Sequence, residues 1–237
     1  METLAFQKKV LAIWVFNPFT LWATEAIGQI DIYSTFFILL CFYLLKSGKL
    51  PWAAVALGFG GAIKTVPFLL LPLLLVFAKD LKAKILITFL AVTPYVFSVI
   101  WFMGSPNFRN DALVAPQIGK SLVAQIPLSG GESVIIYIVA LILIYFFYFQ
   151  KNANLDNFLK YSILIFLITL SLTHFHIQWF LWVMPFLIIL GLENINSVKL
   201  PITGLLISIL AMLFLYEASL QVKLFAPLIP MMDNLSG

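Results

Sequence analysis

The sequence predicts an all-α polytopic transmembrane helical bundle, and its composition excludes a soluble fold. Of the 237 residues, 62% are hydrophobic and only 10% are charged, whereas soluble domains carry about 45–50% apolar and ~25% charged residues. The mean hydropathy is +1.06. A soluble globule of this length could not hide so much apolar surface behind a polar shell. The solvent of this chain is therefore the lipid bilayer.

Apolar runs separated by polar residues, Pro or Gly predict about nine short membrane helices. Several are shorter than the ~20 residues that a helix needs to cross a bilayer, but short helices are tolerated among neighbours or where the bilayer thins. The first run is a retained helix, because the bulky residues after Asn17-Pro18 do not form a signal cleavage site. The predicted segments are 10–24, 31–45, 51–63, 66–78, 84–103, 133–149, 158–173, 178–191 and 199–217.

Residues 51–78 decide the topology, because they could form one helix kinked near Pro67 or a hairpin with Lys64 at its apex. The positive-inside rule favours the hairpin, since the single helix leaves the positive charges almost evenly divided. Pro67 also disfavours a continuous helix. The hairpin leaves Arg109, Lys120 and Lys223 outside. It places on the cytoplasmic side Lys8, Lys9, Lys46, Lys49, Lys79, Lys82, Lys84, Lys151, Lys160 and Lys199.

The chain is predicted to form a single transmembrane domain, 1–237, in a multi-pass arrangement. Its longest polar connection is the outer loop 104–132, in which LVAPQIGKSLVAQI is expected to lie as an interfacial helix. The net charge of +4 does not indicate nucleic acid, because the basic residues are scattered between apolar runs. The single Cys41 excludes an intrachain disulfide and a cysteine-based metal site. No cofactor is expected.

In the hairpin topology, unusual polar residues gather at the outer membrane face. Ionisable groups at membrane depth are costly and indicate function unless a structural role explains them. Asp31 could cap the helix that it begins, Glu25 could be a solvated loop residue, and Gln29 could bond to nearby backbone. Their shared turn favours a site. Lys64 is either a snorkelling lysine or a phosphate contact.

His174 and His176 are the only histidines, and they lie between apolar runs beside Gln178. Imidazoles that donate to a phosphate or a sugar hydroxyl fit this setting better than zinc, since no third strong ligand is spaced with them. Arg109 could add an anion contact or be a solvated loop charge. The aromatic residues of 179–185 are interpreted as packing and interface anchors, with sugar stacking as the alternative.

Three motifs together resemble the GT-C superfamily of multi-pass glycosyltransferases, especially polyprenyl-phosphate-mannose-dependent mannosyltransferases. The first is Asn17-Pro18 followed by Gly28-Gln29-Ile-Asp31 and an apolar helix ending at Lys46-Ser-Gly48-Lys49. The second is Gly58-Phe-Gly60-Gly61-Ala-Ile-Lys64-Thr-Val-Pro67. The third is His174-Phe-His176-Ile-Gln178-Trp179 with Leu181-Trp182-Val-Met-Pro185. The resemblance covers about residues 8–190, and the order of the motifs is more specific than any one of them.

The resemblance implies transfer of a sugar from a polyprenyl-phosphate donor to an unknown acceptor hydroxyl at the outer membrane face. Lys64, His174 and His176 would contact the leaving phosphate, and no metal would be needed. Asp31 is the candidate catalytic base, while Glu25, Gln29, Gln178 and Arg109 would line the substrate pocket. A prokaryotic plasma membrane is the expected location.

One departure from the superfamily pattern affects this interpretation. The principal catalytic Asp usually lies in a first outer loop, but before Glu25 this sequence has only Glu2, on the predicted cytoplasmic side. The chain is therefore expected to be the C-terminal part of a GT-C-like fold. It is a fragment, the second half of a split gene whose N-terminal spans a second chain supplies, or an inactive paralogue. A transporter or flippase of a polyprenyl-linked anion and a non-catalytic membrane subunit are the alternatives. The transporter usually needs repeated halves, and the sequence shows no repeat.

Overall fold

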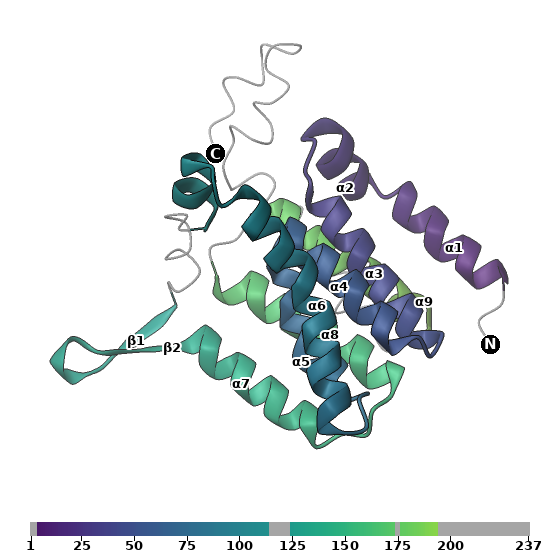
Figure 1. The fold of residues 1–237 in the computed structure, drawn as a ribbon. Helices are drawn as coiled ribbons and strands as arrows, with labels where there is room; N and C mark the ends of the chain where they lie inside the picture. Colours follow the sequence, from purple (N-terminus) through teal and green to yellow (C-terminus); the bar gives the residue numbers. More distant parts are fainter. Residues whose placement is uncertain (1–3, 114–123, 174–175, 194–237) are drawn as a thin grey trace, which may run out of the picture. The chain divides into compact units, whose positions relative to one another are not determined.

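The computed structural model describes residues 4–113, 124–173 and 176–193, and helices make up most of them (Figure 1). The chain divides into two compact units, and each is described by itself. The first unit combines residues 1–29 with 184–237, and the second comprises 30–183. The single domain 1–237 stays a prediction. The predicted segment 199–217 lies outside the described residues.

The first unit contains a helix break that the sequence analysis did not predict. The Asn17 side chain accepts hydrogen bonds from the Phe19 and Thr20 backbone N–H groups, at 2.8 and 3.4 Å. Pro18 follows at the first helical position, where its missing N–H costs nothing. The unbroken segment 10–24 is therefore wrong. The helices of this unit are α1 (Leu4–Val15), α2 (Pro18–Leu21), the π-helix η1 (Trp22–Ala26) and α9 (Met184–Glu193).

The second unit holds the long helices and a small β-hairpin within the loop 104–132. The hairpin pairs Gln125 with Ile135, and glycines with positive φ form its turn. The predicted interfacial helix lies mostly outside the described residues. The elements in order are α3 (Asp31–Lys46), α4 (Leu50–Ile63), η2 (Val66–Leu70), α5 (Leu71–Leu75), α6 (Leu81–Phe102), η3 (Phe108–Leu113), β1 (Gln125–Pro127), η5 (Ser129–Gly131), β2 (Ser133–Ile135), α7 (Ile136–Phe149), α8 (Leu155–Leu172) and η6 (Ile177–Trp182).

The chain reverses direction at Lys64, as the distribution of lysines predicts. Lys64 has extended backbone angles, and the following 3-10 helix η2 packs back against the end of α4. A Cβ added to Gly61 would lie 2.3 Å from the Phe68 ring, so a larger residue would require that ring to move. Beyond the turn, the Tyr148 hydroxyl donates to the Leu73 carbonyl at 3.1 Å. The segment 66–75 is therefore a separate short element and not a continuation of α4.

Contacts between the helices define two ends of the second unit. Asp31 at the start of α3 meets Lys64 at the end of α4, and the Tyr137 hydroxyl bonds to Thr169 near the end of α8. We call this the site end. At the opposite end, Phe158 near the start of α8 contacts the Phe42 and Phe77 rings. We call this the lysine end, because its turns and helix termini carry Lys46, Lys49, Lys79, Lys82, Lys84, Lys151 and Lys160.

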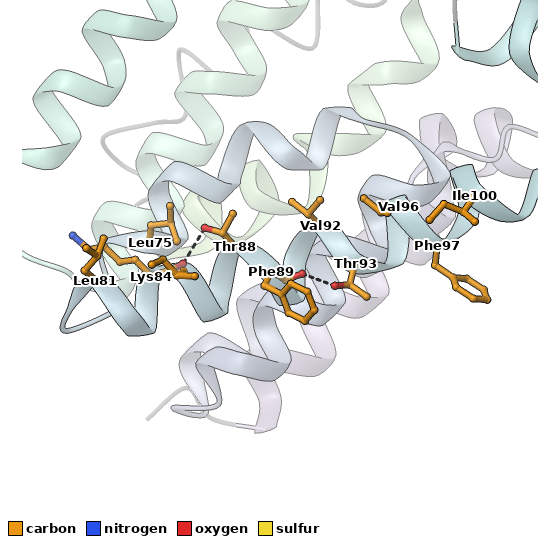
Figure 2. Close-up of a pocket in the computed structure, with 11 residues that line it drawn as sticks. Leu75, Leu81, Lys84, Thr88, Phe89, Val92, Thr93, Val96, Phe97 and Ile100 are labelled. Carbon is orange, nitrogen blue, oxygen red and sulfur yellow. Dashed lines mark hydrogen bonds between the residues drawn. The ribbon is translucent and has the colours of Figure 1, made fainter. Parts of the chain in front are cut away.

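Two described helices, α6 and α8, are long and apolar enough to cross a membrane. At 1.5 Å per residue, the 22 residues of α6 extend about 33 Å, which matches a hydrocarbon core of ~30 Å. Its outward side bears a shallow apolar groove of about 840 Å³ (Figure 2). The Thr88 and Thr93 hydroxyls in that groove donate to carbonyls of their own helix, at 2.9 and 2.7 Å. This side of α6 can therefore face lipid.

The contact between α4 and α6 depends on Gly58. A Cβ at this position would lie 2.3 Å from the Ala91 carbonyl oxygen and 2.9 Å from Pro94 Cδ, so backbone would have to move. We expect Gly58→Ala to lower the free energy of unfolding by about 1–3 kcal/mol, the usual cost of overpacking. Unfolding of the detergent-solubilised chain by denaturant measures it. Gly104→Ala is the control, because nothing lies within 4 Å of its added Cβ; equal losses for both variants would contradict this contact.

Candidate functional site

A buried ion pair forms the centre of the candidate site. The Lys64 ammonium donates to Asp31 Oδ1 at 2.7 Å. The Asp31 side chain is 1% exposed and that of Lys64 is 27% exposed. The two residues are 33 positions apart in the sequence, and the reversal at Lys64 brings them to the same end of the second unit. The two residues are thus in direct contact, while their location on one side of a membrane stays a prediction.

Local structure explains why a carboxylate is stable at position 31. Asp31 is the first residue of α3, where unpaired N–H groups and the helix dipole create a positive potential. The preceding residue Ile30 provides no side-chain cap. Asp31 does not simply cap the helix either, because its Oδ1 bonds to Lys64 and Trp182 instead. The cap interpretation therefore accounts for its location but not for its hydrogen bonds.

Trp182 is the second donor to Asp31, and the sequence analysis did not identify it. Its indole N–H donates to Asp31 Oδ1 at 2.9 Å, and its side chain is fully buried. A buried tryptophan usually needs a hydrogen-bond partner for this group, but the sequence does not show which residue that is. The partner lies 151 positions away. The sequence indicates packing or interface anchoring for Trp182, with sugar stacking as the alternative.

Three aromatic residues form a row on the 3-10 helix η6 and its N-cap. His176, Trp179 and Trp182 recur every third residue, and 3.0 residues per turn places such residues directly above one another. The His176 ring packs edge to face on the Trp179 ring, with 4.8 Å between the ring centroids. The two indoles stack with 5.3 Å between their centroids and an interplanar angle of 18°. We call this set the aromatic row.

The aromatic row surrounds the ammonium of Lys64. Its Nζ lies 5.1 Å from the ring centroids of both Trp179 and Trp182, within the range of a cation–π interaction. One carboxylate oxygen and two indole faces thus hold the cation. Because the Lys64 side chain is still partly exposed, its ammonium can also reach a ligand. These partners account for the position of the Lys64 ammonium without snorkelling, and its role as a phosphate contact stays a prediction.

Asp31 Oδ2 differs from Oδ1. It is buried, and no described residue donates a hydrogen bond to it. A buried acceptor without a donor is costly, so a ligand group that donated to this oxygen would remove that cost. A general base must lie within hydrogen-bonding reach of the proton that it removes, about 2.6–3.2 Å between the two heavy atoms. Among the described residues, no group of three His, Cys, Asp or Glu side chains comes together to hold a metal ion.

The other predicted site residues lie in several different parts of the chain. Glu25 is exposed and Gln29 is half-buried, and both belong to the first unit. The Gln29 backbone N–H bonds to the Ala23 carbonyl at 3.0 Å. Gln178 is half-buried in η6, outside the aromatic row. Arg109 donates to the Met103 carbonyl at 2.7 Å, just after α6, and is exposed. His174 lies outside the described residues.

Comparison with protein families gives a finding that does not depend on the geometry of the site. The model of glycosyltransferase family 87 matches residues 3–172, which is most of the chain. The chain belongs to glycosyltransferase family 87. This is a GT-C-like family of membrane glycosyltransferases. A search of curated proteins and a search of solved structures each found no match.

The family 87 match includes Asp31 and Lys64 but ends before the aromatic row. The contacts of Lys64 with Trp179 and Trp182 therefore come from the structure alone. They join residues inside the matched region to residues beyond it. The candidate site of this family 87 chain therefore includes residues outside the matched region.

The bond from Trp182 to Asp31 can be tested by stability. Trp182→Phe removes the indole donor and keeps an aromatic ring, so Asp31 loses one of its two hydrogen bonds. A hydrogen bond to a charged group contributes about 1.5–3 kcal/mol, and we expect a loss of this size in the free energy of unfolding in detergent. Trp101→Phe is the matched control, because Trp101 is 72% exposed. Equal stability of the two variants would show that the indole bond contributes nothing.

Proposed function

We propose that this family 87 chain transfers mannose from a polyprenyl-phosphate donor to an acceptor hydroxyl at the outer face of a prokaryotic plasma membrane. The observation that carries the proposal is the placement of Lys64. It is a cation held by a carboxylate and two indoles at the end of the unit opposite the lysine-rich turns. A fixed cation at this place suits a phosphate leaving group at the edge of a membrane.

Each residue of the candidate site has its own role in the proposed reaction. The acceptor oxygen attacks the anomeric carbon, the bond from that carbon to the phosphate oxygen breaks, and the phosphate leaves with the bonding electrons. Lys64 stabilises the negative charge that develops there. His176, whose ring centroid lies 4.8 Å from that of Trp179, supplies a second polar contact, together with His174 two residues before it in sequence. The acceptor proton passes to a base, for which Asp31 is the candidate carboxylate.

Family membership favours a transferase over the two alternatives. A transporter or a non-catalytic subunit would also accommodate a lipid-facing α6 and a buried ion pair. Neither is suggested by a match to a glycosyltransferase family across residues 3–172. Mannose as the sugar and polyprenyl phosphate as the carrier rest on the motif resemblance and define the first substrate to test.

Transfer of labelled mannose from polyprenyl-phosphate-mannose in membranes tests the activity and the role of Lys64. We expect Lys64→Gln to reduce the rate at least 100-fold, since a lost electrostatic contact of this kind costs about 10²–10³ in rate. Lys160→Gln is the matched control, because Lys160 also pairs with an aspartate at 2.7 Å but is exposed at the lysine end. Its rate should stay within about twofold of the wild type. Unchanged transfer by Lys64→Gln would remove Lys64 from the site.

The side of the membrane can be tested separately by cysteine labelling. Thr65 is next to Lys64 and exposed, and Asn152 is exposed at the lysine end. The natural Cys41 is buried and should give little background. In intact cells, a membrane-impermeant maleimide should label Thr65→Cys, and it should label Asn152→Cys only after the membrane is opened. Labelling of both positions from outside would contradict the proposed topology.

A further inference from the structure

The charge of the Asp31–Lys64 pair affects which phosphates can bind to Lys64. Asp31 and Lys64 together carry no net charge, and their charged atoms are 2.7 Å apart. An anion that bonds to the open side of the ammonium therefore also experiences the carboxylate behind it. Among the described residues, Lys64 is the cation in contact with both Asp31 and the aromatic row.

The repulsion from Asp31 grows with the charge of the bound phosphate. At an effective dielectric constant of about 20, two unit charges ~5 Å apart shift an equilibrium by on the order of 100-fold. Partial exposure of Lys64 screens this effect, and we take about tenfold as the expected size. A phosphodiester carries one negative charge, whereas a phosphomonoester near neutral pH carries between 1.5 and 2. The carboxylate therefore penalises the monoester more.

We propose that Asp31 makes the Lys64 site selective for a singly charged phosphodiester over a doubly charged phosphomonoester. This inference rests on the proposed function. There, the donor is a prenyl phosphodiester of a sugar, and the leaving group is a prenyl phosphomonoester. Once Asp31 has passed on the acceptor proton and is charged again, the neutral pair accepts the donor and disfavours retention of the product. Trp182 is a positioning residue in this arrangement, because it holds Asp31 through Oδ1.

A matched pair of short lipids tests this selectivity without any catalytic step. Farnesyl phosphate is the monoester, and its methyl ester is the diester with the same prenyl chain. Their dissociation constants for the full-length chain are measured by calorimetry in detergent at about pH 8, where the monoester is mostly doubly charged. Inorganic phosphate, tested alongside, distinguishes recognition of a prenyl lipid from recognition of free phosphate.

Asp31→Asn is the decisive variant. Asparagine keeps an oxygen that can accept from Lys64 and Trp182 but removes the negative charge. We expect it to shift the ratio of the two dissociation constants about tenfold in favour of the monoester. Asp156→Asn is the matched control, because it neutralises the exposed partner of Lys160 at the lysine end, and it should leave the ratio unchanged. An unchanged ratio in Asp31→Asn, or equal weakening of both lipids, would overturn the selectivity and leave Asp31 as a support for Lys64.

Two further variants keep the result interpretable if Asp31→Asn folds poorly. Trp182→Phe retains the carboxylate but loses its indole bond and the indole face that contacts Lys64, so both lipids should bind more weakly at a constant ratio. A tenfold shift of the ratio in this variant would contradict a role for the charge of Asp31. In the double variant Asp31→Asn with Lys64→Gln, the two side chains again carry no net charge. This variant should lose binding of both lipids. If it binds both like the wild type, the phosphate contact of the proposed function is itself wrong.

Discussion

The buried pair of Asp31 and Lys64 is the interaction on which the arrangement of the second unit depends. Each charge alone would be costly in apolar surroundings, and breaking such a pair typically costs 3–5 kcal/mol because the remaining charge is uncompensated. Their 2.7 Å contact ties the start of α3 to the end of α4. It fixes which ends of these two antiparallel helices meet, while the Ser34 hydroxyl adds a bond of 3.4 Å to the Gly60 carbonyl one turn farther in. The same ion pair therefore contributes to the alignment of α3 with α4 and forms the centre of the candidate site.

The reversal after α4 depends on small residues as well as on the ion pair. Gly60 and Gly61 leave room for Pro67 and Phe68 to pack back on the helix that precedes them. An added Cβ at Gly61 would meet the Phe68 ring, which would have to shift. The Lys64 side chain at the turn stays partly exposed. A motif of glycines, a lysine and a proline thus encodes both the turn and the cation that it presents.

The sequence predicted the parts of the fold and site that follow from charge and spacing. The asymmetry of the lysines was enough to predict the reversal at Lys64, and that reversal brought Lys64 to Asp31. The break at Asn17 was missed because its apolar surroundings outweighed the Asn-Pro capping signal. The bond from Trp182 could not be predicted, because it joins residues 151 positions apart and requires a 3-10 helix. An α-helix at 3.6 residues per turn would rotate His176, Trp179 and Trp182 progressively out of line.

The aromatic row also explains how a charged lysine is held at the candidate site. A lone lysine in apolar surroundings tends to extend toward water. Here Asp31 balances the charge, and two indole faces at 5.1 Å contact the ammonium without competing for an incoming oxygen anion. The cation is therefore held in place before the proposed phosphate would arrive, and the proposed reaction would need little reorganisation as negative charge develops on its leaving group. A site that is empty and occupied in turn would require a cation that is stable in both states, and this combination of one carboxylate and two indoles provides it.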